Sequence, residues 1–313
     1  MALVSGYSPT PSAFWNLDNA HLVSGNPDNQ INPGTLTAAG NNATTGQVAH
    51  GARGEAFLYS SGASTRTYFT SSTFELEYNT TFTLSCWFKT SSSGAFISKQ
   101  ENSVNYRGYS LLIDDTGYIK FELTSTQANY LYLRTNATYA DNAWHHVTLT
   151  YTGTSLASGV KIYVDGSIVA TTTLNDDLGS NTTINTMYFN FGRRGNGSGL
   201  GVELYYTGYL DEIGIWSGTA LSAKAVLRLY NNSMGIYSMI DKPTFFNLRD
   251  SVQKQYFKMR GVDSGTSTYT SWTVDRVPDF TGALATVANT SPALSGSITA
   301  NSTIISAQWR KLP

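Results

Sequence analysis

Apolar and polar residues alternate along much of the chain, with the two-residue period of strands that bury one face. In one such segment Phe82, Leu84, Cys86 and Phe88 fall on one face, and Trp87 falls on the other. Similar segments, separated by turn residues, are 109–113, 118–124, 130–135, 144–152, 160–173, 186–192 and 205–216. Many short strands at near-regular spacing predict an all-β fold, a two-sheet antiparallel sandwich.

Local signals mark the turns between these strands and one helix. Asp165-Gly166 lies between alternating apolar residues, which is a strong signal for a β-hairpin. A second hairpin is predicted to turn at residues 115–117. Ser222 is placed to cap a helix, because Val226 and later apolar residues follow at helical spacing. We therefore expect one short surface helix against the sandwich.

The character of the chain changes after about residue 237. Residues 1–12 are predicted to be an N-terminal arm, residues 13–237 the strand-rich domain, and residues 238–313 a mainly β or extended C-terminal extension. The extension has many large apolar side chains, among them Phe245, Phe246, Trp272 and Trp309. It is too short for a substantial core of its own, and exposed apolar surface marks interaction sites. We expect it to mediate docking and assembly, as a homo-oligomer or with other subunits.

Composition narrows the class of protein. The chain has 313 residues, of which 41% are hydrophobic and only 13% charged, against about 25% in an average soluble protein. The net charge is −1 and no basic stripe occurs, which argues against a nucleic-acid partner. No apolar run is long enough for a membrane span. A single cysteine, and a start without the pattern of a secretory signal, predict synthesis in a reducing cytosol.

Two adjacent histidines, His145 and His146, raise the question of a metal site. Neighbouring residues of a strand point to opposite faces, so His145 is expected to share a face with Val147, and His146 with Trp144. Two ligands of one ion must converge, and no further ligand nearby completes a zinc pattern. The pair is therefore predicted to be structural.

Seven motifs in fixed order resemble the laminin G-like, or concanavalin A-like, jelly-roll domains over residues 11–237. The most specific are the Trp-His-His-Val strand at 144–147, the Val-Asp-Gly hairpin at 164–166, and the sequence GYLDEIGIW at 208–216 followed by the predicted helix. The resemblance implies two curved antiparallel sheets packed face to face, with a concave front. Such domains occur in virion proteins, in secreted lectins and in sugar hydrolases, so fold does not fix function.

The resemblance also implies a structural calcium ion near Asp211, with Asp18 or Asn19 as further ligands. By strict alternation Asp211 shares the core face with Ile213 and Ile215, where a carboxylate is costly unless it is paired, hydrogen-bonded or bound to a metal. Calcium takes six to eight oxygen ligands or so. The alternative is an Asp211 carboxylate that accepts backbone N–H groups at the end of its strand.

Aromatic residues outside the apolar alternation are candidates for sugar binding, because sugar rings stack on exposed aromatic rings. The candidates are Trp87, Tyr106, Tyr109, Tyr205 and Tyr206. The alternative for Trp87 is that a loop or the C-terminal segment covers it.

No catalytic pattern is found. Glycoside hydrolysis needs two carboxylates flanking the scissile bond, and glucanases of this superfamily carry a Glu-X-Asp-X-Glu strand. Glu75-Leu76-Glu77 lacks the central aspartate, and no Gly-X-Ser-X-Gly elbow occurs. Cys86 lies in an apolar alternation, where a buried thiol is inert.

The sequence therefore predicts a non-enzymatic virion surface protein, such as a phage fibre, spike or capsid-decoration component. Its partners are expected to be other virion subunits and a host cell-surface glycan, and its location the virion surface. The alternative is a secreted or cell-surface carbohydrate-binding module in the extracellular space. A glycan hydrolase is a third reading with less support.

Overall fold

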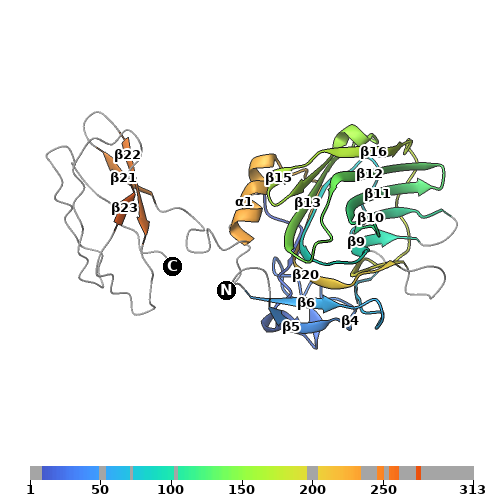
Figure 1. Cartoon of the computed structure of the whole chain (residues 1–313), viewed down its shortest axis with the longest axis horizontal. Helices are drawn as coiled ribbons and strands as arrows, with labels where there is room; N and C mark the ends of the chain where they lie inside the picture. Colours follow the sequence, from blue (N-terminus) through green and yellow to red (C-terminus); the bar gives the residue numbers. More distant parts are fainter. Residues whose placement is uncertain are drawn as a thin grey trace. The chain divides into compact units, whose positions relative to one another are not determined.

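The computed structural model describes residues 9–48, 54–70, 73–101, 105–195, 204–233, 245–249, 254–260 and 273–275 (Figure 1). The chain divides into two compact units, residues 1–235 and 236–313. The described strands of the second unit form a three-stranded antiparallel sheet of β21 (Phe245–Arg249), β22 (Lys254–Arg260) and β23 (Thr273–Asp275). Trp272 and Trp309 lie outside the described residues, and for Phe245 and Phe246 only the strand is described.

The first unit is a sandwich of two eight-stranded antiparallel sheets, as predicted. Sheet I has the order β15-β14-β13-β8-β20-β6-β5, with β1 also paired to β20. Its strands are β1 (Ala13–Trp15), β5 (Thr44–Val48), β6 (Glu55–Tyr59), β8 (Thr81–Lys89), β13 (Trp144–Thr152), β14 (Val160–Val164), β15 (Ser167–Ile168) and β20 (Gly208–Ser217).

Sheet II has the order β16-β12-β11-β10-β9-β17-β7-β4. Its strands are β4 (Gly40–Asn41), β7 (Thr67–Tyr68), β9 (Gly94–Gln100), β10 (Gly108–Ile113), β11 (Tyr118–Thr126), β12 (Asn129–Thr138), β16 (Thr171–Asp176) and β17 (Asn190–Phe191). Figure 1 shows β9 to β12 and β16 side by side. The remaining short elements are β2 (Leu22–Val23), β3 (Asn26–Pro27), β18 (Arg193–Arg194), β19 (Leu204–Tyr205) and the 3-10 turns Asn19–His21 and Ala157–Gly159.

The core lies between the two sheets and is filled by the apolar members of each alternation. On β8 the buried inward residues are Phe82, Leu84, Cys86 and Phe88, as the sequence predicts. Across the core, the ring of Phe88 stacks on that of Phe96 from sheet II, with ring centroids 4.5 Å apart. Each such buried side chain contributes about 1.5–3 kcal/mol to folding.

The hairpin at Asp165-Gly166 is confirmed. Both residues have positive φ, 51° and 77°, as a two-residue turn between twisted strands requires. The returning strand β15 ends at Ile168, and β16 begins at Thr171 in the other sheet. The chain therefore passes from sheet I to sheet II at this point.

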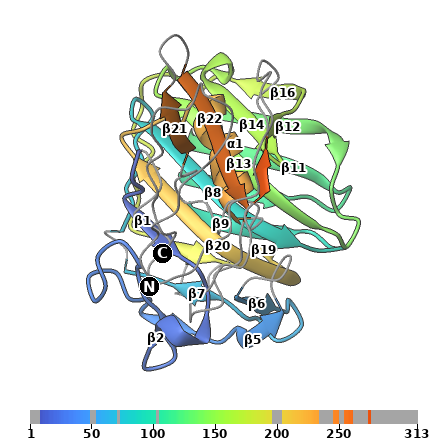
Figure 2. The same cartoon turned by 90° about the vertical axis from the view of Figure 1, so that its left-hand side faces the viewer.

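The single α-helix of the described residues, α1 (Ala223–Ser233), lies on the outer face of sheet I (Figures 1 and 2). The Ser222 side chain accepts a hydrogen bond from the Ala225 N–H at 3.3 Å, so the predicted cap is confirmed. A second apolar cluster forms beneath the helix, and it contains Phe14, Tyr163, Trp216, Leu221, Val226 and Leu229. Among the described residues, no helix is long and apolar enough to cross a membrane.

A β-bulge in β20 overturns the predicted face of Asp211. The register between β20 and β8 shifts between Asp211 and Gly214, and Glu212 takes a φ of 44°. The extra residue places Asp211 opposite Trp87, on the outer face, while Ile213 stays in the core. A strict two-residue period cannot reveal an inserted residue.

The last residues of the predicted N-terminal arm are hydrogen-bonded to the sandwich. The Ser12 N–H donates to the Ile215 carbonyl at 2.7 Å, and Trp216 Nε1 donates to the Pro9 carbonyl at 2.7 Å. Residues 9–12 therefore continue along β20, whereas residues 1–8 lie outside the described part of the chain.

Candidate functional site

Three of the five predicted sugar-binding aromatics are buried. Trp87 stacks on Tyr230 of α1, with ring centroids 5.5 Å apart and an interplanar angle of 27°. Its exposure is 1%, so the expectation that it faces a ligand is wrong, and the cover is the helix. Tyr109 and Tyr206 are also buried, and their hydroxyls donate to the carbonyls of Phe74 and Lys89. These three rings stabilise the fold and offer no surface for stacking.

The other two candidates, Tyr106 and Tyr205, remain partly exposed to solvent. Tyr106 is 40% exposed, in a left-handed conformation with φ 52°. Tyr205 is half-buried on β19, and the guanidinium carbon of Arg193 lies 5.9 Å from its ring centroid.

A group that the sequence analysis did not single out lies on the outer face of sheet II. We call it the β11–β12 face, and it consists of Tyr118, Lys120, Glu122, Tyr130, Tyr132 and Arg134. All six are half-buried, because they alternate with core residues such as Phe121 and Leu133. The alternation was visible in the sequence, but the pairing of the two strands was needed to bring the side chains together.

Within this face each cation lies over a tyrosine of the neighbouring strand. Lys120 Nζ is 5.2 Å from the ring centroid of Tyr132, and the guanidinium carbon of Arg134 is 4.4 Å from that of Tyr118. Lys120 and Arg134 are direct partners in the β11–β12 ladder. The result is a half-buried arrangement in which two cations lie over two aromatic rings.

The acidic groups on and beside this face, Glu122 and Asp114, are each in an ion pair. Lys120 Nζ lies 2.7 Å from an Asp114 carboxylate oxygen, and Arg194 Nη1 lies 3.0 Å from Glu122 Oε2. Burial alone would raise the pKa of Asp114, but hydrogen bonds from Lys120, Thr116 and Tyr118 outweigh burial and hold that pKa below its ordinary value. A carboxyl group kept ionised in this way is unsuited to act as a general acid.

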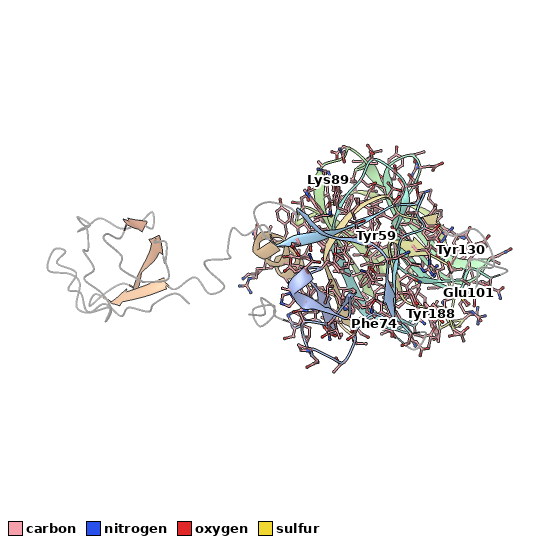
Figure 3. All side chains as sticks on the ribbon, turned by 90° about the horizontal axis from the view of Figure 1, so that it is seen from below. Tyr59, Phe74, Lys89, Glu101, Tyr130 and Tyr188 are labelled. Carbon is pink, nitrogen blue, oxygen red and sulfur yellow. The ribbon has the colours of Figure 1, made fainter. Side chains whose placement is uncertain are left out.

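The β11–β12 face forms one end of a longer row across sheet II. Successive strand pairs align Tyr132, Glu122, Ser110, Ser98, Asn190 and Tyr68. Six strands at about 4.8 Å spacing make the row ~24 Å long. Its centre is small, polar and fully buried, with the Ser98 and Ser110 hydroxyls 2.6 Å apart, so the two ends of the row are separate surfaces. At the far end Tyr68 stacks on Tyr188, and Figure 3 shows Tyr130 and Tyr188 on the side of the jelly roll away from α1.

A smaller aromatic group lies on the outer face of sheet I, next to the part that α1 covers. Trp144, Lys89 and Tyr209 are direct partners on three adjacent strands, and all three are half-buried. The ring centroids of Trp144 and Tyr209 are 5.9 Å apart. This group serves as an internal comparison for the β11–β12 face.

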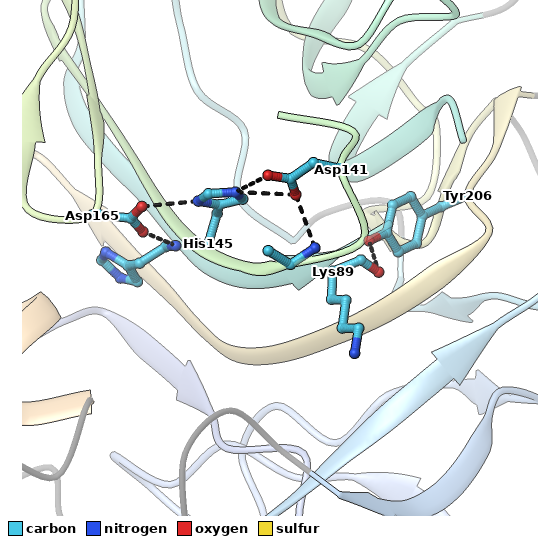
Figure 4. Close-up of polar contacts among 7 residues, drawn as sticks. Lys89, Asp141, His145, Asp165 and Tyr206 are labelled. Carbon is cyan, nitrogen blue, oxygen red and sulfur yellow. Dashed lines mark hydrogen bonds and ion pairs between the residues drawn. The ribbon is translucent and has the colours of Figure 1, made fainter. Parts of the chain in front are cut away.

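The two histidines diverge, as predicted. His146 is buried, and its Nε2 lies 2.9 Å from the Ser85 hydroxyl. Figure 4 shows His145 between two carboxylates, with Nδ1 2.8 Å from Asp165 Oδ2 and Nε2 3.3 Å from Asp141 Oδ1. Asp165 also accepts the His146 N–H at 2.9 Å, so the hairpin turn is fastened to β13. The pair is structural.

The surroundings of His145 make the stability of this fastening depend on pH. The hydrogen bond to Asp165 raises the pKa of His145 above its ordinary value, against the opposing effect of burial. Its stabilising contribution is therefore complete below about pH 6.5 and is lost as the pH rises through the raised pKa. We expect the melting temperature of the wild type to exceed that of His145→Gln most at about pH 5.5, and the difference to shrink towards pH 8.5. A difference that stays constant over this range contradicts the assignment.

Of the predicted calcium ligands, Asp211 and Asp18 each have a carboxylate oxygen that accepts a backbone N–H, and Asn19 is hydrogen-bonded through its own backbone N–H. Asp211 Oδ1 accepts the Glu212 N–H at 2.7 Å, and Asp18 Oδ1 accepts the Glu55 N–H at 2.6 Å. The Asn19 N–H donates to Glu55 Oε2 at 2.7 Å. Within the described ranges, no group of three or more His, Cys, Asp or Glu side chains is placed to hold a metal ion.

Two other polar oxygens near the bulge of β20 have no donor among the described residues. Asn16 Oδ1 and Glu212 Oε2 are buried and have no hydrogen-bond partner. Trp15 pairs with Ile213 in an antiparallel ladder. Asn16, which follows Trp15, therefore lies near Glu212, which precedes Ile213. Buried acceptors without a donor are costly, and carboxylate and amide oxygens are what calcium prefers. The bulge at Glu212 is therefore a second candidate centre for a cation, beside the three predicted residues.

The sequence matches a protein family whose members have this kind of fold. The family described as the concanavalin A-like lectin/glucanases superfamily matches residues 62–227, more than half of the chain. The chain belongs to this family. No curated protein matches the sequence.

Solved structures share the architecture. The binding domain of Paraclostridial Mosquitocidal Protein 1 aligns with a TM-score of 0.52 at 13% identity, over 92% of this chain and 73% of that one. The binding domain of Botulinum neurotoxin DC in complex with rat synaptotagmin II gives 0.50 at 14% identity, over 85% and 62%. The Botulinum neurotoxin serotype D binding domain gives 0.50 at 13% identity, over 96% and 70%. At these identities the likeness shows the fold alone.

Proposed function

We propose that this chain is a non-enzymatic carbohydrate-binding protein that presents the β11–β12 face to a glycan. The observation that carries the proposal is the alternation, on two adjacent strands, of tyrosine rings with charged hydrogen-bonding groups. A sugar has apolar C–H faces and a rim of hydroxyls, so it requires both kinds of contact. Tyrosine supplies a rigid apolar ring and a polar tip at low entropic cost.

The acidic groups support binding rather than hydrolysis. A glycosidase needs one carboxyl group with a raised pKa beside a second carboxylate. Asp114 and Glu122 are each in an ion pair, and the pKa of Asp114 is lowered. Glu77 does not lie on a strand, and hydrogen bonds from Thr182 and Thr183 outweigh burial and lower its pKa. Burial also raises the pKa of the Cys86 thiol, which keeps it protonated and unreactive.

The binding surface is tested with single alanine variants on a glycan array and by calorimetry. We expect Tyr132→Ala and Tyr130→Ala each to weaken binding about 2- to 12-fold, the range for losing one aromatic contact. Tyr209→Ala, on the outer face of sheet I, is the matched control and is expected to bind as the wild type does. If Tyr209→Ala loses binding while Tyr132→Ala keeps it, the ligand lies on the other sheet.

The proposal includes one structural calcium ion at the bulge of β20, held by Glu212 and Asn16, with Asp211 and Asp18 in the surroundings. An ion there would neutralise a buried carboxylate and fasten β1 to β20. Its support is the pair of buried oxygens without donors.

A chelator is therefore expected to lower the melting temperature of the wild type. Glu212→Gln is expected to remove this sensitivity, because the ion loses its charged ligand. Asp115→Asn, at an exposed turn, should keep it. A melting temperature that does not respond to chelator or to added calcium contradicts the ion.

We further propose that the protein is carried on a virus particle, as a fibre, spike or capsid-decoration component that attaches to host glycans. The single, buried Cys86 suits a protein made in a reducing cytosol, and the second unit is a separate segment that would be available for assembly. A secreted or cell-surface carbohydrate-binding module is the alternative, and it predicts the same glycan binding without association with particles.

Assembly is tested by ending the chain at Gly235, where the first unit ends. The shortened protein is expected to keep the melting temperature and glycan binding of the jelly roll. It should lose self-association in sedimentation velocity and be missing from purified particles. A shortened chain that assembles as the full chain does contradicts a role of the second unit in attachment.

A further inference from the structure

The charges of the β11–β12 face do not balance. Lys120 is paired with Asp114 and Arg194 with Glu122, each within 3.0 Å. In the described part of the chain, no hydrogen bond or ion pair is found for the remaining cation, Arg134. The whole chain has a net charge of −1, so this positive charge is a local feature and does not reflect a generally basic surface.

The position of Arg134 is unfavourable for the free protein. In the β11–β12 ladder it stands directly opposite Lys120, and like charges directly opposite each other destabilise a sheet. Packing of its guanidinium over Tyr118, at 4.4 Å, offsets part of this cost. Lys120 is itself paired with Asp114, so the uncompensated charge of this pair lies on Arg134, and a bound anion would supply its countercharge.

The geometry suits recognition of a planar or tetrahedral anion. A guanidinium that lies over an aromatic ring keeps its N–H groups at its edge, where they can donate two parallel hydrogen bonds to a carboxylate or a sulfate. Tyr132 lies beside it on the same strand face, and its ring is already flanked by Lys120. A sugar stacked on the tyrosines would thus bring a charged substituent to Arg134.

We infer that the glycan bound by the β11–β12 face is anionic, and that Arg134 binds its carboxylate or sulfate group. This inference rests on the proposed function, and it adds the chemical class of the ligand and the residue that selects it.

The test measures binding of the full chain to pairs of oligosaccharides that differ only in charge. One arm compares a hyaluronan oligosaccharide with its carboxyl-reduced form, and the other a sulfated galactan oligosaccharide with its desulfated form. We expect the anionic member of at least one pair to bind tenfold or more tighter than its neutral counterpart. The arm that shows the preference identifies carboxylate or sulfate. Added salt should weaken the preference, because it screens exposed charges.

Variants assign the preference to Arg134. Arg134→Gln is expected to abolish the preference while weak binding of the neutral form remains. Arg134→Lys keeps the charge but loses the two-pronged hydrogen bonding, so it should retain only part of the preference. Arg228→Gln, which removes an exposed arginine from α1, is the matched control and should bind as the wild type does. Melting curves establish that each variant is folded.

The outcomes separate the two proposals. Equal binding of neutral and anionic members overturns the inference and leaves carbohydrate binding intact. A preference that survives in folded Arg134→Gln overturns the assignment to Arg134. Equally effective competition by a single-stranded oligonucleotide shows a general polyanion site and also overturns it. If no glycan binds in either arm or on the array, the proposed function fails as well.

Discussion

The long central strands of the sandwich must bury at least one face, and this constraint decides which side chains remain for any other purpose. Cys86 and Phe88 close the core from sheet I, so Trp87 between them must point outward. On that side the outward aromatics need a second cover, and α1 provides it. On sheet II the outward residues of β11 and β12 stay half-exposed. The apolar packing that stabilises the fold thereby also determines where a ligand can contact the protein.

The features predictable from the sequence are those that depend on residues a few positions apart. The alternation in β8, the turn at Asp165-Gly166 and the cap at Ser222 are each determined by local geometry, and the structure has all three. The divergence of His145 and His146 follows from the same two-residue period. Patterns between residues a few positions apart were therefore enough to predict most of the jelly roll.

The candidate site was harder to predict, because it depends on contacts between distant segments. Trp87 is covered by Tyr230, from a helix much later in the chain, and no property of the β8 sequence reveals that contact. Asp211 changed face because of one inserted residue at Glu212, which an alternation rule cannot detect. The pairing of Lys120 with Arg134 required the register of β11 and β12. Long-range register, more than local propensity, is what the sequence leaves undetermined.

The pairing of β1 with β20 joins the first and the last strand of the jelly roll. Ala13 is the ladder partner of Ile215, and the Ser12 N–H reaches the carbonyl of the same residue. During synthesis β1 therefore has no partner until β20 has been made. Sheet I is completed only when nearly the whole jelly roll has left the ribosome, so its folding depends on a contact between segments far apart in sequence.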